Sequence, residues 1–217
     1  LYRNSRLSRY SLLNCTRVAP TIQKHKTDEV LKAVIKERPI FPPNILVGAE
    51  RMNETKIISV TNDKGGVGKT TTVHNFGYAL MKKGYRVLLV DFNAQCDLTA
   101  ELGIAEPDAE NNTLCDAMRP YIMDTDDFLD TAECIRANPN GLDFLPATQE
   151  LADLETLMIQ AYQREMILSS ILQEIAGQYD FILIDCPGSL GQLMVNALMA
   201  SNEVILAAFP EKNSLAG

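Results

Sequence analysis

The segment at residues 56–72, with the sequence KIISVTNDKGGVGKTTT, decides the fold of this chain. Its first part is a short apolar run, residues 57–60, which predicts a buried strand. Its middle part is rich in glycine, which lets backbone N–H groups turn inward around an anion. The apolar spacing over residues 70–83 predicts a helix. A strand, a glycine-rich loop and a helix in this order predict a phosphate-binding loop, because the helix N-terminus adds a positive partial charge.

Two side chains of this loop are suited to a nucleoside triphosphate with magnesium. Lys69 would supply a positive charge to the β- and γ-phosphates, and Thr70 offers its hydroxyl to Mg²⁺. The strict phosphate-loop pattern, G-x-x-x-x-G-K-[ST], places its first glycine at position 63, which is Asp63 here. The next residue is a second lysine, Lys64. A glycine-rich turn that binds no ligand is the alternative, and the flanking strand and helix patterns argue against it.

Further short apolar runs follow the loop and alternate with other segments. A helix is predicted over residues 167–175, because apolar residues recur there with helical spacing. Buried parallel strands with crossover helices produce this alternation, since helices cover both faces of such a sheet. We therefore expect an α/β fold, with a doubly wound, mostly parallel sheet and helices on both faces. The runs that predict further strands are residues 87–90, 142–145, 181–184 and 204–208.

Two of the predicted strands end in an aspartate, at the edge where such sheets bind ligands. Asp185 follows an apolar strand, which is the Walker B pattern, and would hold the Mg²⁺ shell through water. The loop at residues 186–191 contains proline and two glycines, so it is suited to change conformation with the γ-phosphate. Asp91 follows the run at residues 87–90, and the alternative for this residue is that it only caps the strand end.

Residues 64–70, KGGVGKT, resemble the deviant Walker A signature of the ParA/MinD group of ATPases. The resemblance covers roughly residues 55–217. It implies a P-loop ATPase of the deviant Walker A type that forms a dimer over two ATP molecules. In this dimer Lys64 of one copy reaches the nucleotide of the other, where its charge would neutralise charge that develops between the β- and γ-phosphates.

The segment after the second predicted strand resembles the switch I pattern of the same group, D-x-D-P-Q-x-x-x-T. Asp91, Gln95 and Thr99 match it, whereas Asn93 stands where the group has its second aspartate. Asparagine can hydrogen-bond a water molecule but cannot accept its proton. Because phosphoryl transfer depends mostly on positioning and charge stabilisation, the departure predicts weak hydrolysis with intact nucleotide binding.

The resemblance implies ATP and Mg²⁺ as cofactors and assigns roles to individual residues. The catalytic set is Lys64, Lys69 and Asp91. The metal set is Thr70 and Asp185. The phosphate-binding set is Gly65, Gly66, Val67, Gly68, Lys69, Thr70 and Thr71.

The leading functional hypothesis is a ParA-type ATPase for plasmid or chromosome partition. Its implied partners are a second copy of the chain, a centromere-binding ParB-like protein and non-specific DNA, and its implied place is the cytoplasm, at the nucleoid. The DNA contact would lie in a C-terminal part that the group has and this chain is expected to lack. The alternative is a nucleotide-gated positioning module of the MinD type, with little hydrolysis because of Asn93. No stable membrane insertion is expected.

Composition divides the chain into a basic start and an acidic body. The net charge is −8, yet residues 1–26 hold six basic residues and no acid. Residues 1–54 are expected to form an extension, with a short helix at 28–38, before the ATPase domain at 55–217. A disordered leader, a targeting peptide and a DNA-contacting arm are the alternatives for its basic tail. An acidic body is a poor ligand for nucleic acid.

Two smaller observations narrow the class of protein. The five cysteines are scattered and form no C-x-x-C pair, and there are only two histidines. This argues against a zinc ribbon and a disulfide framework, and excludes a histidine-rich metal site. Glu150, Asp153 and Glu155 are compatible with a partner surface, although a solvated helix face is the simpler interpretation.

Overall fold

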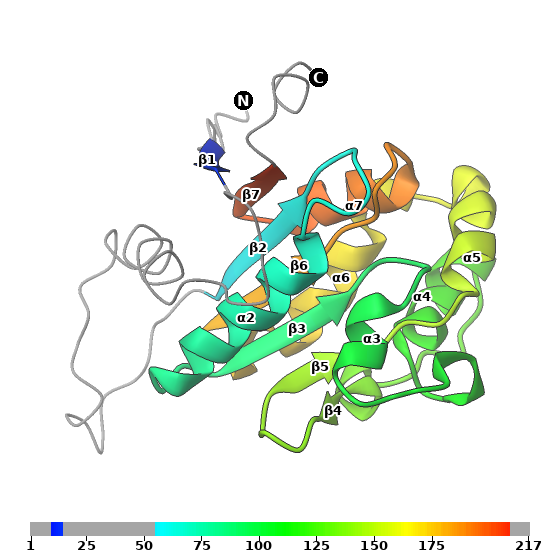
Figure 1. Cartoon of the computed structure of the whole chain (residues 1–217). Coiled ribbons are helices and arrows are strands. Elements are labelled where there is room, and N and C mark those ends of the chain that lie inside the picture. The colour runs from blue at the N-terminus through cyan, green and yellow to red at the C-terminus, as the bar shows by residue number, and fades with distance from the viewer. Residues whose placement is uncertain (1–9, 15–54, 209–217) are drawn as a thin grey trace, which may run out of the picture.

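A seven-stranded sheet forms the centre of the molecule in the computed structural model, which describes residues 10–14 and 55–208 (Figure 1). The strand order is β1-β7-β2-β6-β3-β5-β4. All pairs are parallel except β4 with β5. The bounds are β1 Tyr10–Asn14, β2 Lys56–Thr61, β3 Val87–Asp91, β4 Arg136–Ala137, β5 Asp143–Leu145, β6 Phe181–Asp185 and β7 Glu203–Ala208.

Helices cover both faces of this sheet (Figure 1). The α-helices are α2 Lys69–Lys82, α3 Asp97–Glu101, α4 Leu114–Met123, α5 Leu151–Leu157, α6 Ile167–Ile175 and α7 Gln192–Ala200. Short 3₁₀ turns are η1 Pro107–Ala109, η2 Thr131–Cys134, η3 Met158–Gln160, η4 Arg164–Met166 and η5 Ala176–Gln178. The doubly wound α/β fold expected from the sequence is therefore confirmed.

Two apolar clusters, one on each face, explain why the strands read as unbroken apolar runs. On β3, Leu88 and Val90 pack with α4 to α7, whereas Val87 and Leu89 pack with α2. All five residues of β3 and of β6 are buried. Both faces of a central parallel strand need apolar side chains, so the two-residue alternation of a half-exposed strand is absent here.

The edges of the sheet differ from the expectation. β1 pairs in parallel with β7, and β4 pairs with β5 as a two-residue antiparallel strand. Neither strand has an apolar run of its own in the sequence, so the pattern did not predict them. The predicted helix at residues 28–38 lies outside the described residues. None of the helices in the described ranges is long and apolar enough to cross a membrane.

The strand order brings the predicted site together. β6 lies between β2 and β3, and Asp185 at its end is in register with Val60 of β2 and with Asp91 of β3. The glycine-rich loop leaves β2 at the same edge. Three segments that are far apart in the sequence therefore meet at the carboxyl end of the sheet, where α/β proteins bind ligands.

Candidate functional site

The glycine-rich loop has a backbone that only glycine adopts easily. Gly66 has φ of +70° and Gly68 has φ of +87°, both in the left-handed region. Gly68 is the N-cap of α2, where no side chain caps the helix and no acidic residue lies in the first turn. The first N–H groups of α2 are thus left without an anionic side chain of their own, which suits a bound phosphate.

Lys69 lies in a buried position beneath this loop, and Lys64 lies in an exposed one. The Lys69 ammonium donates to the Lys64 carbonyl over 3.1 Å. A Cβ atom added to Gly188, in the loop after β6, would lie 3.4 Å from Lys69 Nζ. The ammonium group therefore stands between the glycine-rich loop and the loop that follows Asp185.

Asn62, which sequence analysis did not single out, fixes the start of the loop. This buried side chain accepts from the Lys64 N–H over 2.9 Å and donates to the Ala207 carbonyl of β7 over 2.6 Å. One side chain thus joins the backbone of the loop to the neighbouring strand. A polar residue directly after a buried strand was the only signal in the sequence.

Asp91 is buried and held by three hydrogen bonds. Its carboxylate accepts from the Thr99 N–H over 2.8 Å, from the Thr99 hydroxyl over 2.7 Å and from the Asn93 N–H over 3.2 Å. Ala147, two residues after β5, donates its N–H to the same Thr99 hydroxyl. Burial raises the pKa of Asp91 to about 6, while the bonds from Thr99 and Asn93 lower it.

Asp185 is equally buried but lacks partners. Neither carboxylate oxygen has a hydrogen-bond partner in the part of the chain that the structure describes. Burial raises the pKa of Asp185 to about 7, with nearby Thr70 and Lys69 acting in the opposite direction. Buried carboxylates are normally paired or bind a metal. The unpaired carboxylate, with the Thr70 side chain close by, therefore fits a Mg²⁺ site.

Among the described residues there is no group of three or more histidine, cysteine, aspartate or glutamate side chains that could hold a metal by itself. Mg²⁺ usually takes only one or two protein carboxylates, with water and substrate phosphates completing its shell. The arrangement is thus suited to a magnesium ion that arrives with a phosphate ligand.

The Asn93 side chain forms hydrogen bonds within its own loop. Its side-chain oxygen accepts from the Gln95 N–H over 3.3 Å, and its amide donates to the Gln95 side chain over 3.5 Å. The side chain is half-exposed, so it can meet water at this edge. The geometry does not test the expectation of weak hydrolysis, which stays a prediction.

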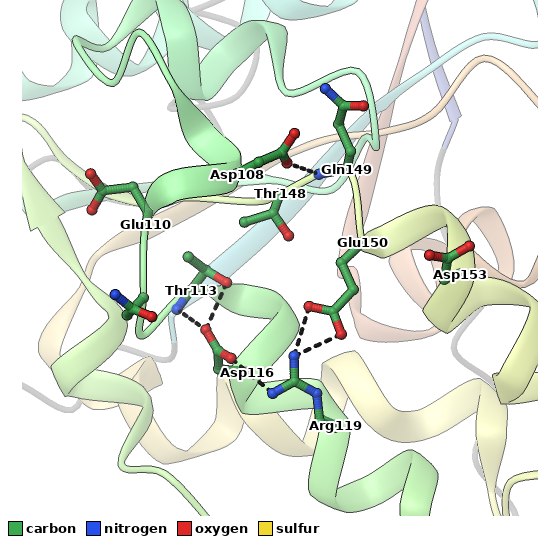
Figure 2. Close-up of a pocket in the computed structure, with 10 residues that line it drawn as sticks. Asp108, Glu110, Thr113, Asp116, Arg119, Thr148, Gln149, Glu150 and Asp153 are labelled. Atoms are coloured by element: carbon green, nitrogen blue, oxygen red, sulfur yellow. Dashed lines mark hydrogen bonds and ion pairs between the residues drawn. The ribbon is translucent and has the colours of Figure 1, made fainter.

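A separate cavity of about 670 Å³ is lined by polar and charged residues (Figure 2). Arg119, one of its lining residues, pairs with Glu150 over 2.7 Å and with Asp116 over 3.0 Å. None of the predicted site residues lines this cavity, so it is not the phosphate site. Its lining residues are Asp108, Glu110, Asn111, Thr113, Asp116, Arg119, Thr148, Gln149, Glu150 and Asp153.

Comparisons with known proteins show to which family and relatives this chain is similar. A family model described as an AAA domain matches residues 55–217. The sporulation initiation inhibitor protein Soj of Bacillus subtilis is 41% identical over 162 residues, which are 75% of this chain and 61% of that protein. The chromosome partitioning protein ParA of Caulobacter vibrioides is 37% identical over 156 residues, 71% of this chain and 56% of that protein.

A solved structure that contains a bound nucleotide analogue is also similar to this chain. Cobyrinic acid a,c-diamide synthase from Mycobacterium smegmatis, crystallised with an ATP analogue and magnesium, is 36% identical with a TM-score of 0.65. The match covers 70% of this chain and 59% of that one. The chain spans about three fifths of the length of the curated relatives it matches.

Proposed function

The chain belongs to the ParA/MinD group of P-loop ATPases, and from this premise we propose that it binds and hydrolyses ATP as a partition ATPase of the ParA type. One observation carries the proposal. A buried ammonium group, Lys69, and the buried Asp185 carboxylate, which has no hydrogen-bond partner among the described residues, lie at the same sheet edge beside a loop of left-handed glycines. A triphosphate with Mg²⁺ complements both charges at once.

Different groups of the chain would bind the phosphates and the magnesium of this ligand. The backbone of residues 65–71 and the Lys69 ammonium would hold the phosphates, and Thr70 with Asp185 would hold the magnesium. Bound ATP with its metal supplies the phosphoryl group and the anhydride bond that is broken. Asp91, fixed by Thr99, would orient water at the same edge. Asn93 can add a hydrogen bond to that water but cannot take its proton.

The exposed position of Lys64 supports a role between two copies of the chain. Its backbone is fixed by Asn62, while its side chain lies at the surface of the loop. In the proposed dimer it contacts the partner's nucleotide and stabilises the charge of phosphoryl transfer, as an arginine finger does.

The proposed biological role is partition of plasmid or chromosomal DNA. The name of the Caulobacter relative supports it. A ParB-like protein would be the partner, and the protein would act in the cytoplasm, at the nucleoid. Non-specific DNA is the other proposed partner.

Calorimetric titration with ATP and Mg²⁺ tests the proposal. The parent chain is expected to bind ATP saturably, and Lys69→Ala should weaken binding at least tenfold, about the effect of one charge-assisted contact. Lys83→Ala is the matched control, because Lys83 is an exposed lysine at the far end of the same helix. A parent that does not bind, or a Lys69→Ala variant that binds as well as the control, would defeat the proposal.

The second candidate is a nucleotide-gated positioning module of the MinD type that hydrolyses ATP very slowly. Asn93 favours it, because the loop carries no carboxylate where the group has its second aspartate. Phosphate release by the parent and by Asn93→Asp separates the two. A gain of tenfold or more in the variant supports the module, whereas brisk turnover by the parent removes it.

A further inference from the structure

Helix α7 begins without a side-chain cap of its own. Its N-cap is Gly191, which has no side chain, and its first turn contains no acidic residue. The missing acceptor comes from a different helix: Glu155 of α5 accepts the Leu193 N–H at Oε1 over 3.1 Å. A carboxylate at this position accepts from a backbone N–H that the helix itself leaves unpaired, and interacts favourably with the helix dipole.

Gly191 makes room for this contact. Its φ of −125° and ψ of −167° are extended values that any residue adopts, so its backbone does not require glycine. The contact does, because a Cβ atom there would overlap the Glu155 carboxylate, lie 3.0 Å from its Cδ and displace it from the start of α7. The contact between α5 and α7 thus depends on both Gly191 and Glu155, which are 36 positions apart in the sequence.

The segment fixed by this contact is the loop that begins at Asp185. At its near end, the Cys186 N–H donates to the Val60 carbonyl over 3.2 Å. Between the two ends lie three exposed residues, Gly188, Ser189 and Leu190, for which the described part of the chain shows no hydrogen bond. The loop is therefore held at two points, by β2 and by Glu155, and passes close to Lys69 between them.

We propose that Glu155 is a positioning residue for ATP hydrolysis, which anchors the far end of the loop after β6. This inference rests on the proposed function, since it assigns Glu155 to the same site. Without the anchor, the start of α7 frays and the loop no longer stays beside Lys69. Glu155 does not touch the phosphate loop itself, so ATP binding should be largely kept while turnover falls.

The test compares Glu155→Ala, Glu155→Gln and Asp153→Asn in the full chain. Asp153 is the matched control, because it is an exposed acid on the same helix without a hydrogen bond to α7. Glu155→Ala should lower kcat about tenfold with KM within about twofold, and should speed amide exchange at Leu193 about tenfold, the effect expected for a lost cap. Glu155→Gln should recover part of both, since its amide oxygen still accepts.

Parental kcat together with parental exchange in Glu155→Ala would overturn the inference, and so would a loss expressed only in KM. If Glu155→Ala does not fold, Glu155→Gln decides: slower turnover with faster exchange supports the anchor, and parental values overturn it. If the parent does not bind ATP, the proposed function fails, and exchange at Leu193 still decides whether Glu155 anchors the loop.

Discussion

Asp91 and Asp185 end neighbouring strands in register, yet their surroundings are opposite. Asp91 receives three hydrogen bonds from the loop that follows it, whereas Asp185 receives none from the described residues. The cause is local sequence. Thr99 returns to Asp91 with two donors, while the loop after Asp185 continues with Pro187, which has no N–H, and the exposed Gly188. The chain completes one carboxylate site itself and leaves the other without a hydrogen-bond partner among the described residues, as the proposed magnesium site requires.

Removing the Asp185 charge should have the largest effect, because this buried carboxylate is the proposed ligand of the magnesium ion. Asp185→Asn is expected to lower ATP hydrolysis by about 10²-fold or more, the range seen for single electrostatic groups at reaction centres. Binding of ATP in EDTA should change little, because Lys69 and the loop backbone stay in place. Steady-state phosphate release and titration with and without Mg²⁺ measure the two effects. Hydrolysis at the parental rate would contradict the comparison.

Stability should depend on pH through the unpaired carboxylate. The pKa of Asp185 in the folded chain is about 7, above the ordinary value of 3.8, so the folded state holds the proton more tightly. Folded-state stability is therefore lost as pH rises through about 4 to 7. From pH 5 to pH 8 in EDTA, the parent should lose roughly 2–3 kcal/mol relative to Asp185→Asn.

Urea denaturation of both chains at several pH values measures this difference. If the free energies of unfolding of the two chains change equally with pH, the buried Asp185 carboxylate does not destabilise the folded state. That result would contradict the interpretation of Asp185.

Near Asp91, substitution of Thr99 is expected to have the largest effect on stability. Thr99→Val keeps the shape but removes the hydroxyl, which leaves Asp91 short of a donor and the Ala147 N–H without its acceptor. The expected loss is about 1–2 kcal/mol in the free energy of unfolding, the cost of unpaired buried polar groups. Thr99→Ser, which keeps the hydroxyl, is the control. Denaturation midpoints at constant m-value measure the loss, and equal stability of the two variants would refute the role of the hydroxyl.

The smallest effect is expected at Gly188, where the two loops come close. An added Cβ would lie 3.4 Å from Lys69 Nζ, a tight contact with a side-chain end. Gly188→Ala should weaken ATP binding by only a few fold, and leave stability within about 0.5 kcal/mol, as for most exposed substitutions. Gly177→Ala is the control, since a Cβ there meets nothing within 4 Å. A loss as large as that of Lys69→Ala would mean that Gly188 does more than border the ammonium group.

The parts of the site that are local in sequence were predictable. The glycine-rich loop, Lys69 and the aspartates at the strand ends follow from short patterns, because each pattern sets its own backbone. The supports were not predictable. Asn62 contacts Ala207 and Glu155 contacts Leu193, and only the folded chain brings these pairs together. Glu155 looked like part of a solvated helix face, since helical spacing alone does not show which neighbour packs against it.

The edges of the sheet escaped prediction for a related reason. Central strands are buried on both faces and need continuous apolar runs, which the sequence displays. A two-residue strand such as β4 needs only the neighbouring strand and backbone hydrogen bonds, so its side chains carry no pattern.

The most direct test of the central claim uses Mn²⁺ in place of Mg²⁺, because its electron paramagnetic resonance signal reports the bound metal. We expect that the parent binds Mn²⁺ tightly only when ATP is present, and that Asp185→Asn loses this binding while retaining ATP. A parent that leaves the signal of Mn²⁺ with ATP unchanged, or an Asp185→Asn variant that binds the metal as well as the parent, would contradict this expectation.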